Sequence, residues 1–215
     1  MKTESRRDFY EELYRDRDTP SPQQFPRHFE FCLRLLAPER PVRKVLDLGG
    51  GTGGYSLRLQ NEGLDVVLLD FSPTAVAKAA AQGVARTICA DFMTHDFAGE
   101  RFDVVFCKGF SPLNTDDDEE FDRVMKRIDL LLAPGGGVAY WARTDDSERW
   151  TDSGWYCPSL ARITRHFERA VLLPKFHRQL SLPMWLNLAV SALYRLRLRM
   201  RPRETLLIAT RRRRD

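Results

Sequence analysis

The sequence has few of the residues that mark a zinc protein or a secreted protein. Its 215 residues include four cysteines and four histidines. The cysteines at positions 32, 89, 107 and 157 lack C-x-x-C spacing, and no cluster of cysteines and histidines has zinc-ligand spacing. This pattern predicts reduced thiols and no metal site. The chain also lacks a positively charged start followed by an apolar run, so we expect a cytoplasmic protein.

Long hydrophobic runs are also absent. The longest uncharged stretch covers residues 179–194 and contains Pro183 and Asn187. As a helix it would span about 24 Å, less than the ~30 Å hydrocarbon core of a bilayer, so it is not predicted to cross a membrane. Arginines follow it up to residue 201. The segment 179–201 can therefore lie at a membrane surface, form a homodimer contact, or pack on its own domain.

Positive charge is concentrated in the C-terminal tail. The chain has a net charge of +4. Residues 195–215 contain nine arginines against Glu204 and Asp215, a local charge of +7, and the preceding residues carry −3. Such a tail either attracts an anionic partner or is a solvated end that keeps the protein soluble.

The first 41 residues have a helical pattern of their own. Residues 4–16 place aromatic and charged side chains at helical spacing, a Pro-rich break follows at 19–22, and residues 23–36 predict a second helix. We expect residues 1–41 to form a helical lid over the remaining domain, residues 42–215. The length of the chain fits one domain with a full core.

A glycine-rich turn follows the first predicted strand. Val45 to Leu48 lead into Gly49-Gly50-Gly51-Thr52-Gly53-Gly54. The letters fit G-x-G-x-x-G and also D-x-G-x-G-x-G. Glycine allows positive φ and close approach of a ligand to the backbone, and the following helix presents unpaired N–H groups. The turn alone predicts either a dinucleotide or S-adenosylmethionine.

The segments that follow separate these two readings. Strand-like runs alternate with helical stretches, which indicates a parallel sheet with ligands at the carboxyl ends of its strands. The second strand ends in Asp70, the third (84–90) leads to Asp91-Phe92, and the turn at 134–137 opens the fifth. A nicotinamide oxidoreductase would share Asp70 but gives no reason for Asp91 or for the Pro-Gly-Gly turn.

Over about residues 42–144 the sequence resembles the class I S-adenosylmethionine-dependent methyltransferases. The resemblance implies an α/β fold: a Rossmann-like, seven-stranded, mostly parallel sheet with an antiparallel last strand and helices on both faces. Residues 170–173 and 206–209 supply the last two strands, and 175–204 form an insertion between them. We expect this insertion to form the acceptor-side wall.

The resemblance also implies roles for individual residues. Asp47 would bind the cofactor's ammonium, Asp70 the ribose hydroxyls and Asp91 the adenine amino group. Asp47 can instead be a structural acid of the turn, Phe71 a core residue and Lys108 a solvated side chain. The full predicted cofactor set is Asp47, Gly49, Gly51, Gly53, Asp70, Phe71, Asp91, Phe92 and Lys108.

The methyl acceptor is the least defined part of the prediction. After the fourth strand the chain reads Lys108-Gly109-Phe110-Ser111-Pro112, which lacks the Asn/Asp-Pro-Pro-aromatic motif of enzymes that methylate base amines. We therefore expect a small or hydrophobic small molecule rather than a nucleic acid. An RNA or protein methyltransferase that uses the arginine tail is the alternative. His28, Tyr10 and Asp145 are candidate general bases, and the sequence singles out none of them.

Overall fold

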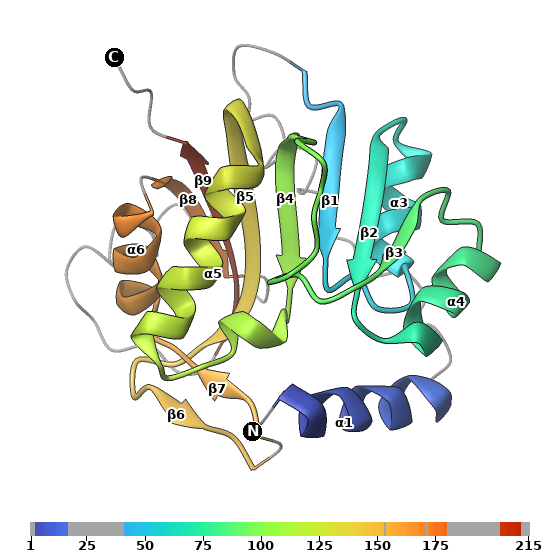
Figure 1. The fold of residues 1–215 in the computed structure, drawn as a ribbon. Coiled ribbons are helices and arrows are strands. Elements are labelled where there is room, and N and C mark those ends of the chain that lie inside the picture. Colours follow the sequence, from blue (N-terminus) through green and yellow to red (C-terminus); the bar gives the residue numbers. More distant parts are fainter. Residues whose placement is uncertain (1–2, 17–40, 153, 171, 180–202, 212–215) are drawn as a thin grey trace.

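The centre of the protein is a seven-stranded sheet in the order β3-β2-β1-β4-β5-β9-β8 (Figure 1). The computed structural model describes residues 3–16, 41–152, 154–170, 172–179 and 203–211. The helix expected at 23–36, His28 and most of the 175–204 insertion lie outside these ranges. The strands are β1 Lys44–Leu48, β2 Asp65–Asp70, β3 Thr87–Cys89, β4 Phe102–Lys108, β5 Leu132–Thr144, β8 Leu172–Gln179 and β9 Arg203–Arg211.

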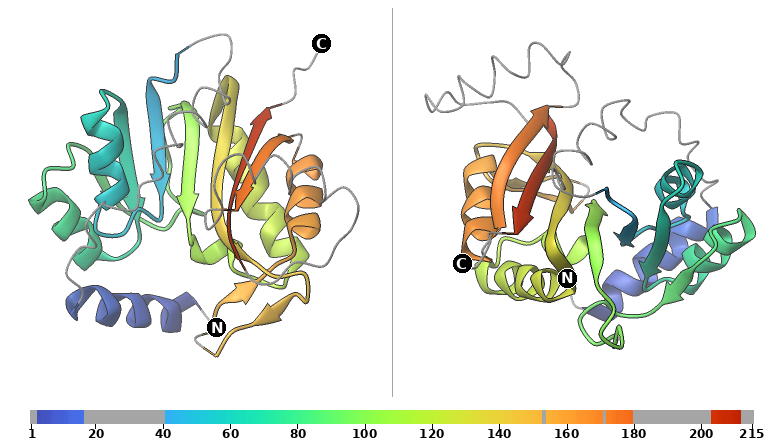
Figure 2. Two further views of the ribbon diagram at one scale, coloured as in Figure 1. Left: turned by 180° about the vertical axis from the view of Figure 1, so that it is seen from behind. Right: turned by 90° about the horizontal axis from the view of Figure 1, so that it is seen from above.

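Helices cover both faces of this sheet (Figures 1 and 2). Helices α5 and α6 pack on one face and α3 on the other, while α4 lies near the β2–β3 edge and α1 lies below the strand ends. Their bounds are α1 Thr3–Asp16, α3 Gly54–Asn61, α4 Pro73–Ala81, α5 Asp118–Leu131 and α6 Leu160–Arg169. The Rossmann-like fold class expected from the sequence is confirmed.

The central strands form from apolar runs that are buried on both faces. Val45 and Val104 belong to the core on one face of the sheet, and Leu46 and Val105 belong to the core on the other. All four are fully buried. Successive side chains of a strand point to opposite faces, so a strand covered by helices on both sides needs apolar residues at every position.

The last strand is the one that reverses direction. β9 runs antiparallel to both β5 and β8, whereas β1, β2, β3, β4 and β5 pair in parallel. β8 extends to Gln179, beyond the end expected from the sequence. The segment between the two strands is therefore shorter than the predicted 175–204.

A two-stranded hairpin lies in a segment for which the sequence analysis predicted no strand. It consists of β6 Arg149–Trp150 and β7 Tyr156–Cys157. The hairpin follows β5 and lies at the carboxyl ends of the strands, near the start of α1 (Figure 1). Its strands are two residues long, too short for strand periodicity to be visible in the sequence.

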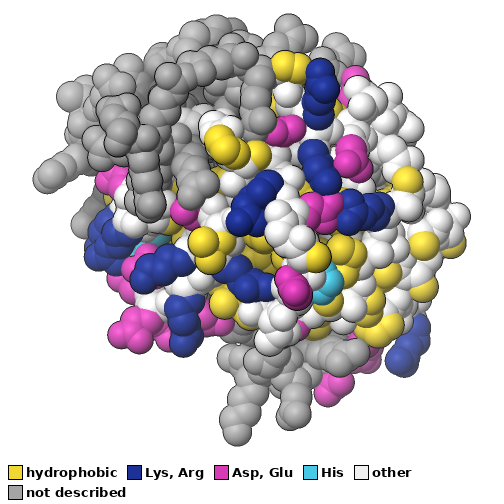
Figure 3. Space-filling model, turned by 45° about the horizontal axis from the view of Figure 1, so that its top comes forward, with side chains coloured by type: hydrophobic (Ala, Val, Ile, Leu, Met, Phe, Trp, Pro, Cys, Tyr) yellow, Lys and Arg dark blue, Asp and Glu magenta, His cyan; other side chains and the backbone are white. Residues whose placement is uncertain are grey.

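The face at the amino ends of the strands carries both signs of charge. Figure 3 shows Lys and Arg side chains interspersed with Asp and Glu on the described part of this face. Glu100 forms 2.6 Å ion pairs with both Lys44 and Arg86 there. Among the described residues, no helix has the length and apolar content needed to cross a bilayer.

Candidate functional site

The glycine loop joins β1 to α3 and approaches its neighbours closely. Gly49, Gly51 and Gly53 all have positive φ. A Cβ added at Gly49 would lie 2.8 Å from the Phe110 ring, and one added at Gly51 would lie 2.9 Å from the Tyr14 hydroxyl. Glycine is therefore required here both by the backbone conformation and by the available space.

Gly53 has a different role from the other two. It is the N-cap of α3, and a Cβ there would lie 2.7 Å from Val84 and 2.9 Å from the Ala79 side chain. These contacts let α3 and α4 pack together. Gly53 was predicted to bind the cofactor because it lies in the glycine loop. Its close neighbours show instead that it allows the two helices to pack together.

Asp70, at the end of β2, holds the loop in place. One carboxylate oxygen accepts from the Gly51 N–H at 2.9 Å, and the other accepts from the Ser72 N–H at 2.9 Å. Burial raises the pKa of Asp70, and these backbone N–H groups partly offset the rise. Each carboxylate oxygen has a second lone pair, so both can also accept a bond from a ligand.

Asp47 lies behind the loop and is 2% exposed. Its carboxylate accepts a 2.6 Å hydrogen bond from the Ser56 hydroxyl. Burial raises the pKa of Asp47 to about 7; the nearby Asp70 adds to the rise, while Ser56 and Lys108 counteract it. Two buried carboxylates thus flank one loop, an arrangement that a positively charged ligand would stabilise.

A cavity of about 620 Å³ opens in front of the loop. Its volume falls in the range of pockets that bind small ligands. Phe71, Cys89 and Asp91 line it on the β2–β3 side, and Gly49 and Gly109 line it toward β1 and β4. The cavity therefore crosses the carboxyl ends of four neighbouring strands.

Asp91 and Phe92 follow β3 on this side of the cavity. Asp91 is exposed and accepts a 2.7 Å bond from the Met93 N–H, which starts a turn. Phe92 is 3% exposed, and its ring meets Phe110 edge to face at 5.6 Å. Phe92 therefore belongs both to the hydrophobic core and to the wall of the cavity.

Helix α1 lies across the mouth of the cavity and contributes Tyr10 and Tyr14 to its lining. The Tyr10 ring meets Phe71 edge to face at 5.6 Å. Lys78 of α4 donates to the Tyr14 carbonyl at 2.6 Å, and so binds the C-terminal end of α1.

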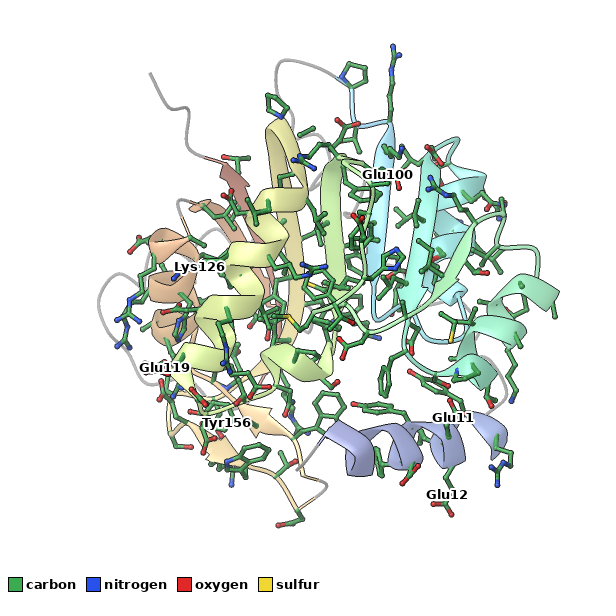
Figure 4. The ribbon with its side chains drawn as sticks, viewed as in Figure 1. Glu11, Glu12, Glu100, Glu119, Lys126 and Tyr156 are labelled. Atoms are coloured by element: carbon green, nitrogen blue, oxygen red, sulfur yellow. The ribbon has the colours of Figure 1, made fainter. Side chains whose placement is uncertain are left out.

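A second bond also anchors α1 to α4. Thr74 donates a 2.6 Å hydrogen bond to Glu11. Glu11 points from α1 toward the body of the protein, whereas Glu12 points away from it (Figure 4). The two anchors hold α1 against α4, and its tyrosines consequently face the cavity.

Lys108, at the end of β4, is partly exposed and does not line the cavity. Its ammonium donates a 2.7 Å bond to the Tyr55 hydroxyl and lies 4.4 Å from the centre of the Trp141 ring. It lies close enough to Asp47 to lower that group's pKa. Lys108 therefore supports the carboxylate behind the loop rather than the open side of the site.

Asp145, one of the candidate bases, lies in the hairpin segment and is 6% exposed. Its carboxylate accepts from the Ser147 hydroxyl and from Arg149, both at 2.8 Å. Burial raises the pKa of Asp145, but the bonds from Ser147 and Arg149 outweigh burial and lower the pKa below its ordinary value. A carboxylate held in its ionised form by an arginine is a weak proton acceptor, so we do not carry Asp145 forward as a base.

The site thus brings together Gly49, Asp70, Phe71, Asp91 and Tyr10, with Asp47 directly behind. Tyr14 and Phe110, which also line the cavity, were not in the predicted cofactor set, although Tyr14 belongs to the expected lid and Phe110 to the stretch after the fourth strand. Tyr14 follows Tyr10 by four residues, which places both on one helix face and was a usable signal. The described residues contain no cluster of ligands suited to a metal ion. The bare loop, the buried acids and the cavity fit a cationic adenosyl ligand.

Comparison with known proteins identifies a family for the central part of the chain. Residues 45–136 match the family described as "Methyltransferase domain". This range contains the glycine loop, Asp70 and Asp91.

Curated relatives match over the same region. A glycine/sarcosine N-methyltransferase of Parasynechococcus marenigrum (strain WH8102) is 44% identical over 117 residues, covering 48% of this chain and 41% of the relative. A demethylmenaquinone methyltransferase of Thermus thermophilus is 34% identical over 109 residues, covering 47% of each. The chain spans less than half the length of these relatives.

Solved structures share the fold over nearly the whole chain. The CcbJ methyltransferase from Streptomyces caelestis aligns with a TM-score of 0.67 at 16% identity, covering 94% of this chain and 96% of that one. At this identity the likeness concerns the fold alone.

Proposed function

We propose that the chain carries a class I S-adenosylmethionine-dependent methyltransferase domain and that it transfers a methyl group directly to a small-molecule acceptor. The observation that carries the proposal is the joint placement of the bare glycine loop, Asp70 and Asp91 around one cavity. Asp47 supports it, because a buried carboxylate behind the loop favours a positively charged ligand.

S-adenosylmethionine, when bound, supplies a methyl group on a positively charged sulfur. We assign the ribose hydroxyls to Asp70, the adenine edge to Asp91 and the adenine face to Phe71. Tyr10 and Tyr14, held over the cavity by α1, would exclude water from the reacting groups. Transfer of a methyl group from a sulfonium needs alignment and desolvation more than proton transfer, so we assign no general base.

The acceptor is proposed as a small molecule because most of the relatives are named for such acceptors. Their names include glycine/sarcosine and demethylmenaquinone. Another relative is named for the malonyl-[acyl-carrier protein], a protein-bound acceptor. One relative is named for ribosomal RNA. The shared stretch contains the cofactor loop and acids, so similarity there reports on the cofactor more than on the acceptor. No feature of the described site favours the nicotinamide alternative.

The proposal is tested by calorimetry on the full chain with S-adenosylmethionine, S-adenosylhomocysteine and NAD. We expect the two adenosyl compounds to bind and NAD to give no heat. Gly49→Ala and Gly63→Ala form a matched pair, because both glycines have positive φ but only Gly49 has a close neighbour. Both variants should lose about 1 kcal/mol of stability because of the positive φ, Gly49→Ala should lose more because of its close approach to Phe110, and only Gly49→Ala should abolish binding.

Two results would contradict the proposal. One is micromolar affinity for NAD with no response to S-adenosylhomocysteine. The other is equal loss of binding in Gly49→Ala and Gly63→Ala, since that would place the ligand away from the loop.

A further inference from the structure

The connection from β3 to β4 carries the residues that would read the adenine ring. It covers residues 90–101 and contains no helix or strand. The connection lies on the side of the sheet that α5 covers (Figures 1 and 2). Irregular connections are held by what they contact rather than by a ladder of their own. The position of Asp91 and Phe92 therefore depends on the partners of this connection.

Two groups at the start of the connection match one edge of adenine. Asp91 uses one carboxylate oxygen to accept from the Met93 N–H at 2.7 Å, and no described residue donates to the other oxygen. The Phe92 N–H likewise has no acceptor within the described ranges. A carboxylate beside an N–H donor complements the 6-amino group and N1 of adenine. The same pair opposes the oxygen and the N1–H of hypoxanthine.

Arg127 clamps the turn that contains this pair. It lies in α5 and reaches the connection with its side chain. Its Nε donates to the Phe92 carbonyl at 2.5 Å, and its Nη2 donates to the His95 carbonyl. A guanidinium presents its donors in a fixed planar fork, so it sets the distance between two acceptors. One side chain thus holds the carbonyls at both ends of the turn.

Further contacts transmit this clamp to Asp91. The guanidinium carbon of Arg127 lies 5.3 Å from the centre of the Phe92 ring, within the range of a cation–π contact. Within the turn, the His95 N–H donates to the Asp91 carbonyl at 2.9 Å. A group that holds the backbone of His95 and Phe92 therefore also holds Asp91.

The turn has few other attachments through which it could be held. Asp91 is exposed, and Met93 is 37% exposed. Among the described residues outside the turn, Arg127 alone forms hydrogen bonds to residues 91–95. Arg127 does not line the cavity, so any effect on a ligand there passes through the turn.

We propose that Arg127 is a positioning residue for the cofactor: it holds the Asp91–Phe92 edge in the geometry that distinguishes adenine from a base with an oxygen in place of the 6-amino group. This inference rests on the proposed function, and it extends that function from the residues that touch the base to the residue that places them.

The test compares S-adenosylhomocysteine with S-inosylhomocysteine, in which an oxygen replaces the 6-amino group. Calorimetry on the full chain measures both affinities. The wild-type protein should prefer the adenosyl compound at least about a hundredfold, because Asp91 and the Phe92 N–H are both mismatched by hypoxanthine. Arg127→Met keeps an unbranched apolar chain and removes the fork. It should weaken the adenosyl compound about tenfold, leave the inosyl compound unchanged, and so lower the preference about tenfold.

Arg101→Met is the matched control. Arg101 belongs to the same connection and also donates to backbone carbonyls, those of Gly99 and Glu100, at 3.2 and 3.1 Å. Both carbonyls lie outside the turn, so this variant should keep both affinities. Arg127→Lys replaces the fork by a single point of donation, and it should lower the preference by about threefold.

An unchanged preference in Arg127→Met would overturn the inference, even if both affinities fell together, because a purely structural role weakens the two compounds equally. If Arg127→Met does not fold, the preference measured in Arg127→Lys decides in the same way. A wild-type protein that does not bind S-adenosylhomocysteine would contradict the proposed function and this inference with it. Binding of both compounds with equal affinity would leave the methyltransferase proposal standing and overturn the role of Arg127 alone.

Discussion

The buried acids of β1 and β2 and the buried acid after β5 have pKa values that are shifted in opposite directions. Asp47 and Asp70, beside the glycine loop, are buried and have raised pKa values. Asp145 in the hairpin segment is also buried and has a lowered pKa. The difference lies in the balance of effects. At Asp47 and Asp70, burial outweighs the hydroxyl and backbone N–H bonds, whereas at Asp145 the bonds from Ser147 together with Arg149 outweigh burial.

This contrast separates a binding region from a structural one. A buried carboxylate without a cation is costly, so a fold retains it where a ligand offsets the cost. A buried carboxylate paired with arginine is already neutralised and can fix a turn. We therefore assign ligand binding to the region after β1 and β2, and a structural role to the acid in the hairpin segment.

The largest expected effect that tests this assignment is that of Asp70→Ala on cofactor affinity. The change removes the anchor of Gly51 and Ser72 and the proposed ribose contact together. We expect S-adenosylhomocysteine to bind about 3 kcal/mol more weakly, roughly a hundredfold, by calorimetry. The control is Asp145→Ala, also at a buried acid, which should bind normally. Equal losses in both variants would remove the distinction between the two regions.

A second prediction concerns stability and pH. Because the pKa of Asp47 is raised to about 7, the folded protein keeps a proton there that the unfolded chain loses near its ordinary pKa of 3.8. The contribution of Asp47 to the free energy of unfolding therefore falls as the pH rises from about 4 to 7 and is constant above pH 7. Asp47→Asn should remove this slope and stabilise the ligand-free protein by about 2 kcal/mol at pH 8.

The opposite sign is expected in the hairpin. The lowered pKa of Asp145 means that its ionised form stabilises the fold above about pH 4 and that this contribution is lost in stronger acid. Asp145→Asn should therefore destabilise the protein at pH 8. Urea unfolding of Asp47→Asn and Asp145→Asn at pH 5 and pH 8 measures the change in the free energy of unfolding that each substitution causes. A change of the same sign in both variants at pH 8 would contradict the difference proposed between the two acids.

The third prediction concerns α1, which covers the ligand side of the contrast. Deleting residues 1–16 removes Tyr10 and Tyr14 from the cavity. We expect S-adenosylhomocysteine affinity to fall by about 1.5 kcal/mol, the scale of aromatic contacts and burial, with a smaller loss in stability. Glu12→Ala, on the outward side of α1, is the control and should change neither quantity. Unchanged S-adenosylhomocysteine affinity after the deletion would show that α1 packs against the domain without contributing to ligand binding.

The geometry of the glycine loop could be predicted from the sequence and that of the hairpin could not, for a physical reason. Glycines with positive φ and acids at strand ends are local requirements, so Gly49, Gly51 and Asp70 were identifiable. The antiparallel β9 was predictable from its apolar run. The hairpin was not, because its place depends on bonds such as the one from the Tyr156 N–H to Asn114, which join residues 42 positions apart.

The smallest expected effect comes from breaking one of these long-range hydrogen bonds. Asn114 accepts from the Tyr156 N–H and donates to its carbonyl, so Asn114→Ala should release β7 from the loop after β4. We expect the free energy of unfolding to fall by about 1 kcal/mol and the Tyr156 amide to exchange its hydrogen faster, with cofactor affinity unchanged. Asn61→Ala, at the exposed end of α3, is the control and should show neither change. A drop in S-adenosylhomocysteine affinity in Asn114→Ala would mean that the hairpin shapes the cofactor end of the cavity as well, and the division between a binding region and a structural one would then be wrong.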